Sequence, residues 1–307
     1  MRWEAEGVLS VEMEFLDGSP LPAWAPGSHL DLHLPGVITR QYSLCGSPAD
    51  RRTWRIAVLL EPNSRGGSQA VHTALRPGDH VSVVGPRNNF SLVESPNYLF
   101  IAGGIGITPL IPMLEVADSA GSNWRLVYGG RTRTAMAFAS DLEAKYGDRV
   151  QVVPQDVYGL LDLESLLGTP EEATRIYCCG PEPLLSAVEN RCNGTWPSGA
   201  LHVERFLARP RQAVDSAEED SFEVVLQRTG RTVEVAPGQS VLEALDTAGL
   251  NFPSSCREGI CGTCEAKVLD GVPDHRDSLL SEEERAANDT MMICVGRSKG
   301  PRLVLDL

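Results

Sequence analysis

The sequence predicts a multidomain chain: an antiparallel β-barrel, then an α/β domain with a parallel sheet, then a small α+β domain. Its 307 residues suit two or three domains. Short strands without helices recur up to about residue 93, and strands alternate with helices from Tyr98 onward. We expect domains at 1–94, 95–207 and 221–307, with a linker at 208–220.

The first part reads as β structure. Short runs such as VLSVEMEF, HLDLHL and WRIAVLL are separated by turn dipeptides, among them Asp17-Gly18 and Pro77-Gly78. Many short strands at such spacing predict a small barrel.

The second part alternates between two patterns. YLFIAG, WRLVYGG, VQVVPQ and RIYCCG are runs of the kind found in buried strands. Helical segments separate or follow them, and this alternation predicts a mostly parallel sheet. The expected helices are Pro109–Asp118, Ala135–Tyr146, Leu161–Leu167 and Pro183–Asn190.

The third part begins after a stretch, ARPRQAVDSAEEDS, that has no periodicity and reads as a linker. FEVVLQRTGRTVEVAPG predicts a two-stranded ribbon that turns at Thr229-Gly230. SVLEALDTAGL predicts a helix, because Ser240 and Glu243 have capping-box spacing. EAKVLDG and PRLVLDL predict two more short strands.

Composition limits the partners and the compartment. The net charge of −14 makes nucleic acid and anionic membranes poor partners, so we expect neither. The first residues show no signal peptide and no stretch reads as a membrane span, which predicts a cytoplasmic protein. In a reducing compartment the eight cysteines are expected to be ligands or core residues instead of disulfides.

Four cysteines have the spacing of a plant-type [2Fe–2S] site. Cys256, Cys261 and Cys264 form C-x4-C-x2-C, and Cys294 in MMICVG, read as a distant strand, is the fourth ligand. The ligand loop must wrap around a cluster, so we expect positive φ at Gly259 and Gly262. Structural zinc is the alternative, but it usually shows two C-x2-C pairs or added histidines. The spacing therefore predicts one-electron transfer.

Two turns in the second part have features of a nucleotide site. A-G-G-I-G-I-T-P follows a strand and opens a helix, with Thr108 as expected N-cap and Pro109 as first helical residue. A helix N-terminus suits a pyrophosphate, although the glycines lack G-x-G-x-x-G spacing and a turn without a ligand is the alternative. In Y-C-C-G-P, Gly180-Pro181 places Cys179 at the carboxyl end of the sheet, where ligands bind. Cys178 is expected in the core.

The barrel carries a third motif, R-Q-Y-S-L, at the end of a predicted strand. Arg40 could pair with a phosphate, Tyr42 could stack on a flat ring, and Ser43 could hydrogen-bond to that ring. Taken alone, the motif is a weak signal, because a strand that carries an Arg and a Tyr is usually an ordinary strand.

Together, R-x-Y-S, G-G-I-G-I-T-P and C-G-P resemble the ferredoxin–NADP reductase superfamily. The C-terminal cysteine motif narrows the resemblance to the phthalate dioxygenase reductase family, which includes vanillate demethylase reductases. Further local matches are R-G-G-S, P-R-N-N-F and E-R-F at Glu204–Phe206. The family usually has another barrel strand before Glu6–Phe15, so this barrel either lacks one or forms a stunted one from Met1–Ala5.

The resemblance implies a flavin barrel, a nicotinamide domain and a β-grasp ferredoxin, with FMN and NADH as cofactors. It implies Ser43, Cys179 and Phe206 as catalytic residues. The flavin residues that it implies are Arg40, Gln41, Tyr42, Ser43, Ala57, Val58, Gly66, Gly67, Ser68, Thr108 and Phe206. The nucleotide residues that it implies are Gly104, Gly106, Arg131, Cys179, Gly180 and Pro181. NADPH stays open, because Arg131 and Arg133 could read a ribose phosphate.

The resemblance also implies a function. Electrons from NADH would pass through FMN to the [2Fe–2S] cluster and on to a separate Rieske-type oxygenase or demethylase acting on an aromatic substrate. A Rieske site needs two Cys and two His, and no Cys-x-His occurs here. A cytochrome P450 acceptor and a non-catalytic carrier with a degenerate reductase region remain alternatives. We expect a monomer, and an acidic segment around Glu282–Glu284 reads either as a docking face or as a solvated helix.

Overall fold

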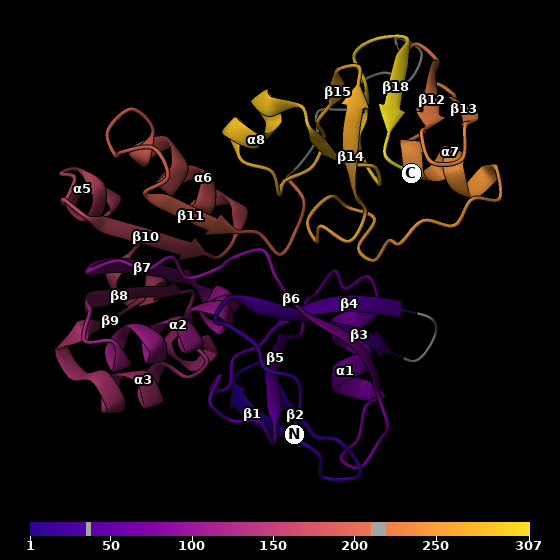
Figure 1. Cartoon of the computed structure of the whole chain (residues 1–307). Coiled ribbons are helices and arrows are strands. Elements are labelled where there is room, and N and C mark those ends of the chain that lie inside the picture. Colours follow the sequence, from indigo (N-terminus) through magenta and orange to yellow (C-terminus); the bar gives the residue numbers. More distant parts are fainter. Residues whose placement is uncertain (35–37, 210–218) are drawn as a thin grey trace. The chain divides into compact units, whose positions relative to one another are not determined.

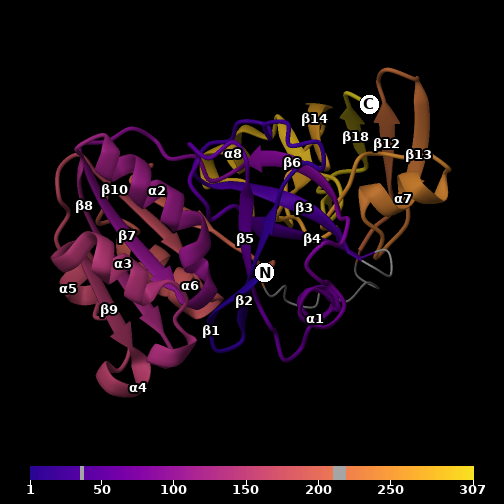
Figure 2. The same ribbon diagram turned by 90° about the horizontal axis from the view of Figure 1, so that it is seen from below.

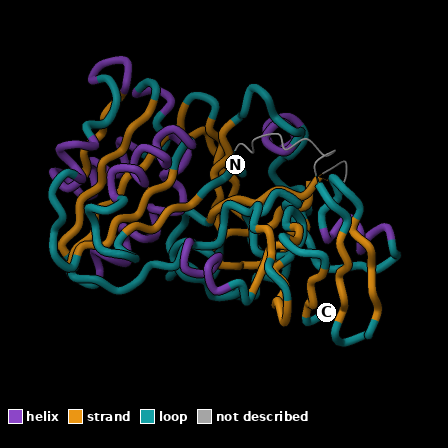
Figure 3. The backbone as a smooth tube through the Cα atoms, turned by 90° about the horizontal axis from the view of Figure 1, so that it is seen from above, coloured by secondary structure: helices purple, strands orange, loops and turns teal. Residues whose placement is uncertain are grey.

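A computed structural model describes residues 1–34, 38–209 and 219–307. The chain divides into two compact units, Met1–Glu204 and Arg205–Leu307. Most of the predicted linker, residues 210–218, lies outside the described residues. Strands and loops make up most of the chain (Figure 3). Within the described ranges, no helix has the length and apolar character needed to cross a membrane.

The first unit begins with a barrel of two three-stranded antiparallel sheets, as predicted. One sheet has the order β1-β2-β5 and the other β4-β3-β6, and a bridge between Leu44 and Ile56 connects them. Trp54, Ile56, Leu30 and Leu32 fill the shared core. The strands are β1 (Arg2–Ala5), β2 (Val8–Met13), β3 (Ser28–Leu34), β4 (Ile38–Ser43), β5 (Trp54–Leu59) and β6 (Ser82–Asn88), and α1 is Gly67–Thr73. Residues 2–5 thus supply the short first strand.

The rest of the first unit is a five-stranded parallel sheet in the order β11-β10-β7-β8-β9 (Figure 1). Figure 2 shows β8, β7 and β10 side by side. The strands are β7 (Asn97–Gly103), β8 (Asn123–Gly130), β9 (Val150–Pro154), β10 (Thr174–Cys179) and β11 (Leu201–Glu204). The helices are α2 (Ile107–Ser119), α3 (Ala139–Tyr146), α4 (Gln155–Tyr158), α5 (Leu163–Leu167) and α6 (Glu182–Cys192).

Side-chain alternation along the strands gives this sheet two buried faces. Leu99, Ile101 and Cys178 pack with α5 and α6, which confirms Cys178 as a core residue. Phe100 and Tyr177 point to the other face, where their rings lie 5.9 Å apart. Tyr177 lies beneath the chain that enters the sheet, because its hydroxyl accepts the Val93 N–H at 2.6 Å and donates to Ser91 O at 3.0 Å.

The expected start of α2 was wrong. The helix begins at Ile107, because Gly104–Gly106 already forms a 3-10 turn, and Gly106 is the N-cap. Thr108 therefore lies inside the first turn, where its Oγ1 donates to the carbonyl of Ile105 at 3.0 Å. Pro109 is the third helical residue and not the first.

The second unit is a five-stranded sheet in the order β13-β12-β18-β14-β16, packed on α7. The predicted ribbon and capping box are confirmed: Ser240 Oγ accepts the Glu243 N–H, and Glu243 accepts the Ser240 N–H. The strands are β12 (Phe222–Leu226), β13 (Arg231–Val235), β14 (Glu265–Asp270), β15 (Pro273–Asp274), β16 (Thr290–Met292), β17 (Arg297–Ser298) and β18 (Arg302–Leu305), and the helices are α7 (Val241–Thr247) and α8 (Glu282–Ala287).

A buried arginine fixes the start of this unit. Arg297 is 3% exposed, pairs with Glu219 at 3.2 Å and donates to the carbonyls of Asp220 and Ala236. Arg276 contacts the same Glu219 carboxylate at 2.8 Å. Buried charges are stable only when paired, so these contacts hold the incoming chain to the sheet.

Candidate functional site

The four predicted ligand cysteines converge. Cys256 lies within hydrogen-bonding reach of Cys261 and Cys294, and Cys264 lies within reach of Cys294. Contact with Cys261 and Cys294 lowers the pKa of Cys256, and contact with Cys294 lowers that of Cys264. The same contacts raise the pKa values of Cys261 and Cys294. The four thiols are therefore close neighbours, and iron binds their thiolate forms.

The backbone around these thiols fits a cluster. Gly259 and Gly262 have φ values of 72° and 74°, as predicted. The Glu258 N–H donates to Cys256 Sγ at 3.3 Å, and the N–H groups at 260 and 261 also point to this sulfur. Cys294 lies in a turn directly after β16, so its expected place in a strand was wrong. The turn lets its side chain leave the sheet plane.

The donor set fits a two-iron group. Among the described residues, no three His, Cys, Asp or Glu side chains are placed to hold one metal ion. A [2Fe–2S] cluster takes four thiolates spread over two irons, so it does not require such a group. The four cysteines therefore fit the cluster that their spacing predicts.

The barrel brings together Arg40 and the loop before α1. Arg40 Nη2 donates to the carbonyl of Arg65 at 2.7 Å. A Cβ atom on Gly67 would lie 2.4 Å from Arg40 Cγ, so only glycine leaves room for this side chain. Ser68 lies in the first turn of α1, where its Oγ accepts the Glu61 N–H at 3.1 Å. Arg40, Gly66, Gly67 and Ser68 thus lie together in a small cradle, and binding of a flavin phosphate there stays a prediction.

The other predicted barrel residues differ in their surroundings. Tyr42 packs against the barrel core, and burial raises the pKa of its hydroxyl to about 12. Gln41 donates to Asp31 at 3.0 Å, so its side chain serves the strand pair β3–β4. Ala57 and Val58 are buried in β5, and the ring of His72 donates to the Val58 carbonyl at 2.9 Å. For Gln41 and Val58 the structure thus offers a structural role.

The two glycine turns of the parallel sheet touch. A Cβ atom on Gly106 would lie 2.2 Å from the carbonyl oxygen of Cys179, and one on Gly180 would lie 3.0 Å from Gly103 Cα. β7 and β10 are adjacent parallel strands, so the turns at their carboxyl ends must share this edge. The glycines let the two turns pack backbone against backbone at the start of α2, where Gly103 meets Gly180 and Pro181 and Gly106 meets Cys179, while a Cβ atom on Gly104 would have no close neighbour among the described residues.

One residue that the sequence analysis did not select lies at the centre of this region. Glu204 ends β11 directly beside Cys179, to which it is paired in the parallel register. Its Oε2 lies 3.4 Å from Ser43 Oγ, which can donate to it, and 4.0 Å from Cys179 Sγ. Ser43 belongs to the barrel, so this carboxyl group joins the two halves of the unit.

Burial controls the protonation of this group of three residues. Burial raises the pKa of Glu204 to about 8, although the hydrogen bond from Ser43 favours the carboxylate. Burial and the neighbouring Glu204 raise the pKa of Cys179 well above its usual value. Cys179 therefore favours the thiol form and is a poor nucleophile.

The remaining predicted residues lie around this centre. Arg131 is exposed in the turn after β8, and its carbonyl accepts the Asp156 N–H at 3.1 Å. Arg133 is paired with Glu143 and donates to Ser140 through Nη2, so its role toward a nucleotide stays a prediction. Thr108 is buried at the start of α2. Phe206 lies two residues after Glu204, in the second unit, and its role stays a prediction.

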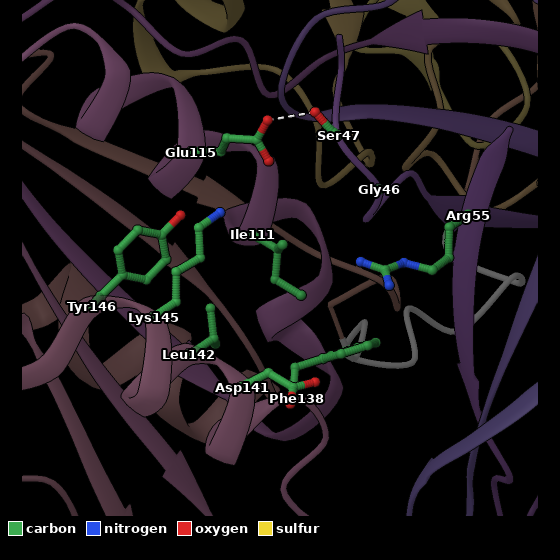
Figure 4. A pocket seen from close by; sticks show the side chains of 10 residues that line it. All are labelled: Gly46, Ser47, Arg55, Ile111, Glu115, Phe138, Asp141, Leu142, Lys145 and Tyr146. Carbon is green, nitrogen blue, oxygen red and sulfur yellow. Dashed lines mark hydrogen bonds between the residues drawn. The ribbon is translucent and has the colours of Figure 1, made fainter. Parts of the chain in front are cut away.

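A pocket of about 210 Å³ lies between the barrel and the parallel sheet's helices (Figure 4). Ser47 Oγ donates to Glu115 across it, and Arg55 stacks on Phe138 with 5.3 Å to the ring centroid. A second connection joins Glu6 to Thr134 through N–H···O=C at 2.9 Å. These contacts hold the barrel, which carries Ser43, against α3 and against α2, which carries Thr108.

Comparisons with known proteins show the family of this chain. Residues 224–299 match the family model described as 2Fe-2S iron-sulfur cluster binding domain. Phenoxybenzoate dioxygenase subunit beta of Ectopseudomonas oleovorans is 45% identical over 305 residues, covering 99% of this chain and 94% of that protein. The chain belongs to the phthalate dioxygenase reductase family. It is a flavin- and iron–sulfur-dependent oxidoreductase of that family.

Two solved structures extend the similarity to the whole fold. The structure of phthalate dioxygenase reductase superposes with a TM-score of 0.72 at 35% identity, covering 99% of this chain and 95% of that chain. An intact type IV self-sufficient cytochrome P450 monooxygenase superposes with a TM-score of 0.94 at 46% identity. This chain is covered completely but spans only 40% of that monooxygenase. The barrel, parallel sheet and ferredoxin unit are thus the family's three domains.

Replacing Glu204 by Gln should change how stability depends on pH. Between about pH 4.5 and 8 the folded wild type keeps a proton that the unfolded chain has lost, so its free energy of unfolding falls as pH rises. Glu204→Gln removes this loss. We expect the melting temperature of the variant minus that of the wild type to increase from pH 5 to 8 and to stay constant above pH 8. Thermal unfolding followed by circular dichroism measures this, with the exposed Glu14→Gln as control; parallel curves for Glu204→Gln and wild type would contradict it.

Proposed function

We propose that this chain carries electrons from NADH through FMN to its [2Fe–2S] cluster and on to a separate Rieske-type oxygenase or demethylase that acts on an aromatic substrate. One observation carries the proposal: a single chain combines the Ser43–Glu204–Cys179 centre with four convergent cluster thiols. The first suits transfer of a hydride between two stacked rings, and the second suits transfer of single electrons. This combination argues against a carrier with a degenerate reductase region.

The chain's own residues would bind, orient and shield. Arg40, Gly67 and Ser68 would hold the flavin phosphate, and Tyr42 would lie against the ring. A bound flavin accepts electrons in pairs from a nicotinamide and releases them singly, which the cluster requires. Ser43 and the neutral Cys179 thiol would position the two rings, while Glu204 excludes water and can hold a proton at its Oε2. In this role Cys179 forms no covalent bond.

The choice of FMN follows the family, and the small cradle at Arg40 and Gly67 supports it as a site for one terminal phosphate. The choice of NADH has support from Asp156. Its N–H bonds to the Arg131 carbonyl, so its exposed side chain lies at the carboxyl end of β9 next to the turn that follows β8. An acidic residue at this edge of such a sheet suits ribose hydroxyls and repels a ribose phosphate.

Two lines of support bear on the acceptor. The relatives named phenoxybenzoate dioxygenase and phthalate dioxygenase are oxygenase systems for aromatic acids. The given residues contain no Cys-x-His pair, and their six histidines are scattered, so Rieske ligands are not among them. The similarity to a self-sufficient P450 monooxygenase favours a second acceptor, a P450 haem. The net charge of −14 supports a protein partner over nucleic acid or anionic membrane, and we propose a monomer.

An anaerobic titration with NADH tests the electron path. The purified chain should bind FMN and two irons, and about one and a half equivalents of NADH should bleach both chromophores, since flavin and cluster together take three electrons. Visible spectra with cofactor extraction and iron analysis measure this. A chain that holds the cluster but no flavin, or that holds both without NADH reducing them, would overturn the proposed function.

Replacing Asp156 by Ser should relax the preference for NADH. Without the carboxylate the ribose phosphate of NADPH loses a like-charge neighbour, so we expect kcat/KM for NADPH to rise about tenfold with little change for NADH. Steady-state reduction of cytochrome c measures both values. Asp148→Asn, another exposed acid in this unit, serves as the control. An unchanged ratio would remove Asp156 from nucleotide selection.

Rapid mixing with two acceptors should identify the partner class. We expect the NADH-reduced chain to reduce the Rieske centre of an aromatic-acid oxygenase at least about tenfold faster than a P450 haem, because a docked acceptor shortens the transfer distance. Electron paramagnetic resonance follows the Rieske centre, and the carbon monoxide spectrum follows the haem. Faster haem reduction would favour the second acceptor.

A further inference from the structure

Asp277 is a buried acid in the second unit that none of the proposed steps uses. It lies between β15 and α8, and its side chain is 1% exposed. A carboxylate is seldom buried so completely unless its contacts hold it in place. Because Asp277 lies next to the loop that carries the ligand cysteines, its charge can affect reduction of the cluster.

The segment around Asp277 packs directly on the loop that carries the cluster ligands. A Cβ atom on Gly259 would lie 2.8 Å from Asp277 Cα and 2.7 Å from Val295 Cγ2. The N–H of Ser278 donates to the carbonyl of Gly259 at 2.9 Å. Gly259 lies between Cys256 and Cys261, and Val295 follows Cys294. Asp277 therefore adjoins both segments that supply ligands.

Among the described residues, hydrogen bonds hold one oxygen of the carboxylate but not the other. Its Oδ2 accepts the N–H groups of Leu279 and Leu280 at 3.0 and 2.8 Å, and Arg285 Nη2 lies 3.4 Å away. Arg285 is held by the carbonyls of Asp277 and Leu280, so it balances the charge from one side. Oδ1 is buried and has no hydrogen-bond partner within the described part of the chain.

We propose that Asp277 lowers the reduction potential of the [2Fe–2S] cluster. Reduction adds one electron from the flavin to the cluster and makes or breaks no bond, so the cluster becomes more negative. A fixed negative charge in a poorly solvated surrounding opposes that change, and Arg285 partly offsets the effect. Asp277 is not a ligand of the cluster, and its effect on the reduction potential is electrostatic. The inference rests on the proposed cluster.

Asp277→Asn in the full chain tests this inference. Asparagine keeps an oxygen that accepts the Leu279 and Leu280 N–H groups but removes the charge. We expect about tenfold more reduced cluster at the wild-type midpoint, which for one electron is a positive shift of about 59 mV. Spectroelectrochemical titration measures the midpoint, and iron content with visible circular dichroism confirms that the cluster is intact. The exposed Glu282→Gln, on α8, is the control and should keep the wild-type midpoint.

Arg285→Gln provides an independent second variant. Removal of the balancing cation should move the midpoint in the negative direction, opposite to Asp277→Asn. If Asp277→Asn does not assemble a cluster, this negative shift supports the inference and an unchanged midpoint overturns it. Equal midpoints in wild type and an intact Asp277→Asn overturn it directly. Failure of the wild type to hold a cluster at all would instead refute the proposed function.

Discussion

The close contact between the turns after β7 and β10 determines where the functional side chains of the first unit lie. The carbonyl of Cys179 occupies the space that any side chain at position 106 would need, so the two strand ends approach as only glycine permits. This contact sets the start of α2 against Cys179, and the parallel register then sets Glu204 beside it. Because Glu204 reaches Ser43 in the barrel, one backbone approach aligns three side chains from three strands.

Desolvation gives these side chains their chemical character. The carboxyl group of Glu204 and the thiol of Cys179 both favour their neutral forms, because burial penalises charge. A neutral thiol can lie against a nicotinamide without reacting with it. In the second unit Cys261, Cys264 and Cys294 are buried and Cys256 is partly exposed, and binding of iron would deprotonate all four thiols. Cysteines in the two units therefore serve opposite purposes.

The sequence predicted the features that depend on local spacing. The four ligand cysteines, the positive φ at Gly259 and Gly262, and the place of Cys179 at the end of its strand all follow from short motifs. Glu204 was not selected, because a glutamate that ends a strand is usually exposed and the E-R-F match drew attention to Phe206 alone. The signal that could have found it is its position in E-R-F combined with the register of β10 and β11.

Other features escaped prediction because they depend on contacts between distant segments. The start of α2 moved forward because the glycine turn is already helical, and Cys294 lies in a turn because it must leave the sheet to meet Cys264. Asp277 reads as one acid in an acidic stretch until Gly259 is seen to pack against it. Hydrophobic periodicity finds strands and helices, but it does not say which polar side chain they bury.

The proposed hydride transfer and the proposed single-electron transfer depend on residues in different units of the chain. The first unit ends at Glu204, so the chain leaves it beside the proposed hydride site. In the second unit, which begins at Arg205, Arg276 and the buried Arg297 hold Glu219 just before β12. The covalent link between the units makes transfer from flavin to cluster intramolecular and independent of protein concentration. Only the final transfer, from cluster to acceptor, then depends on an encounter with a second protein, and the charge at Asp277 would set how readily the electron is released there.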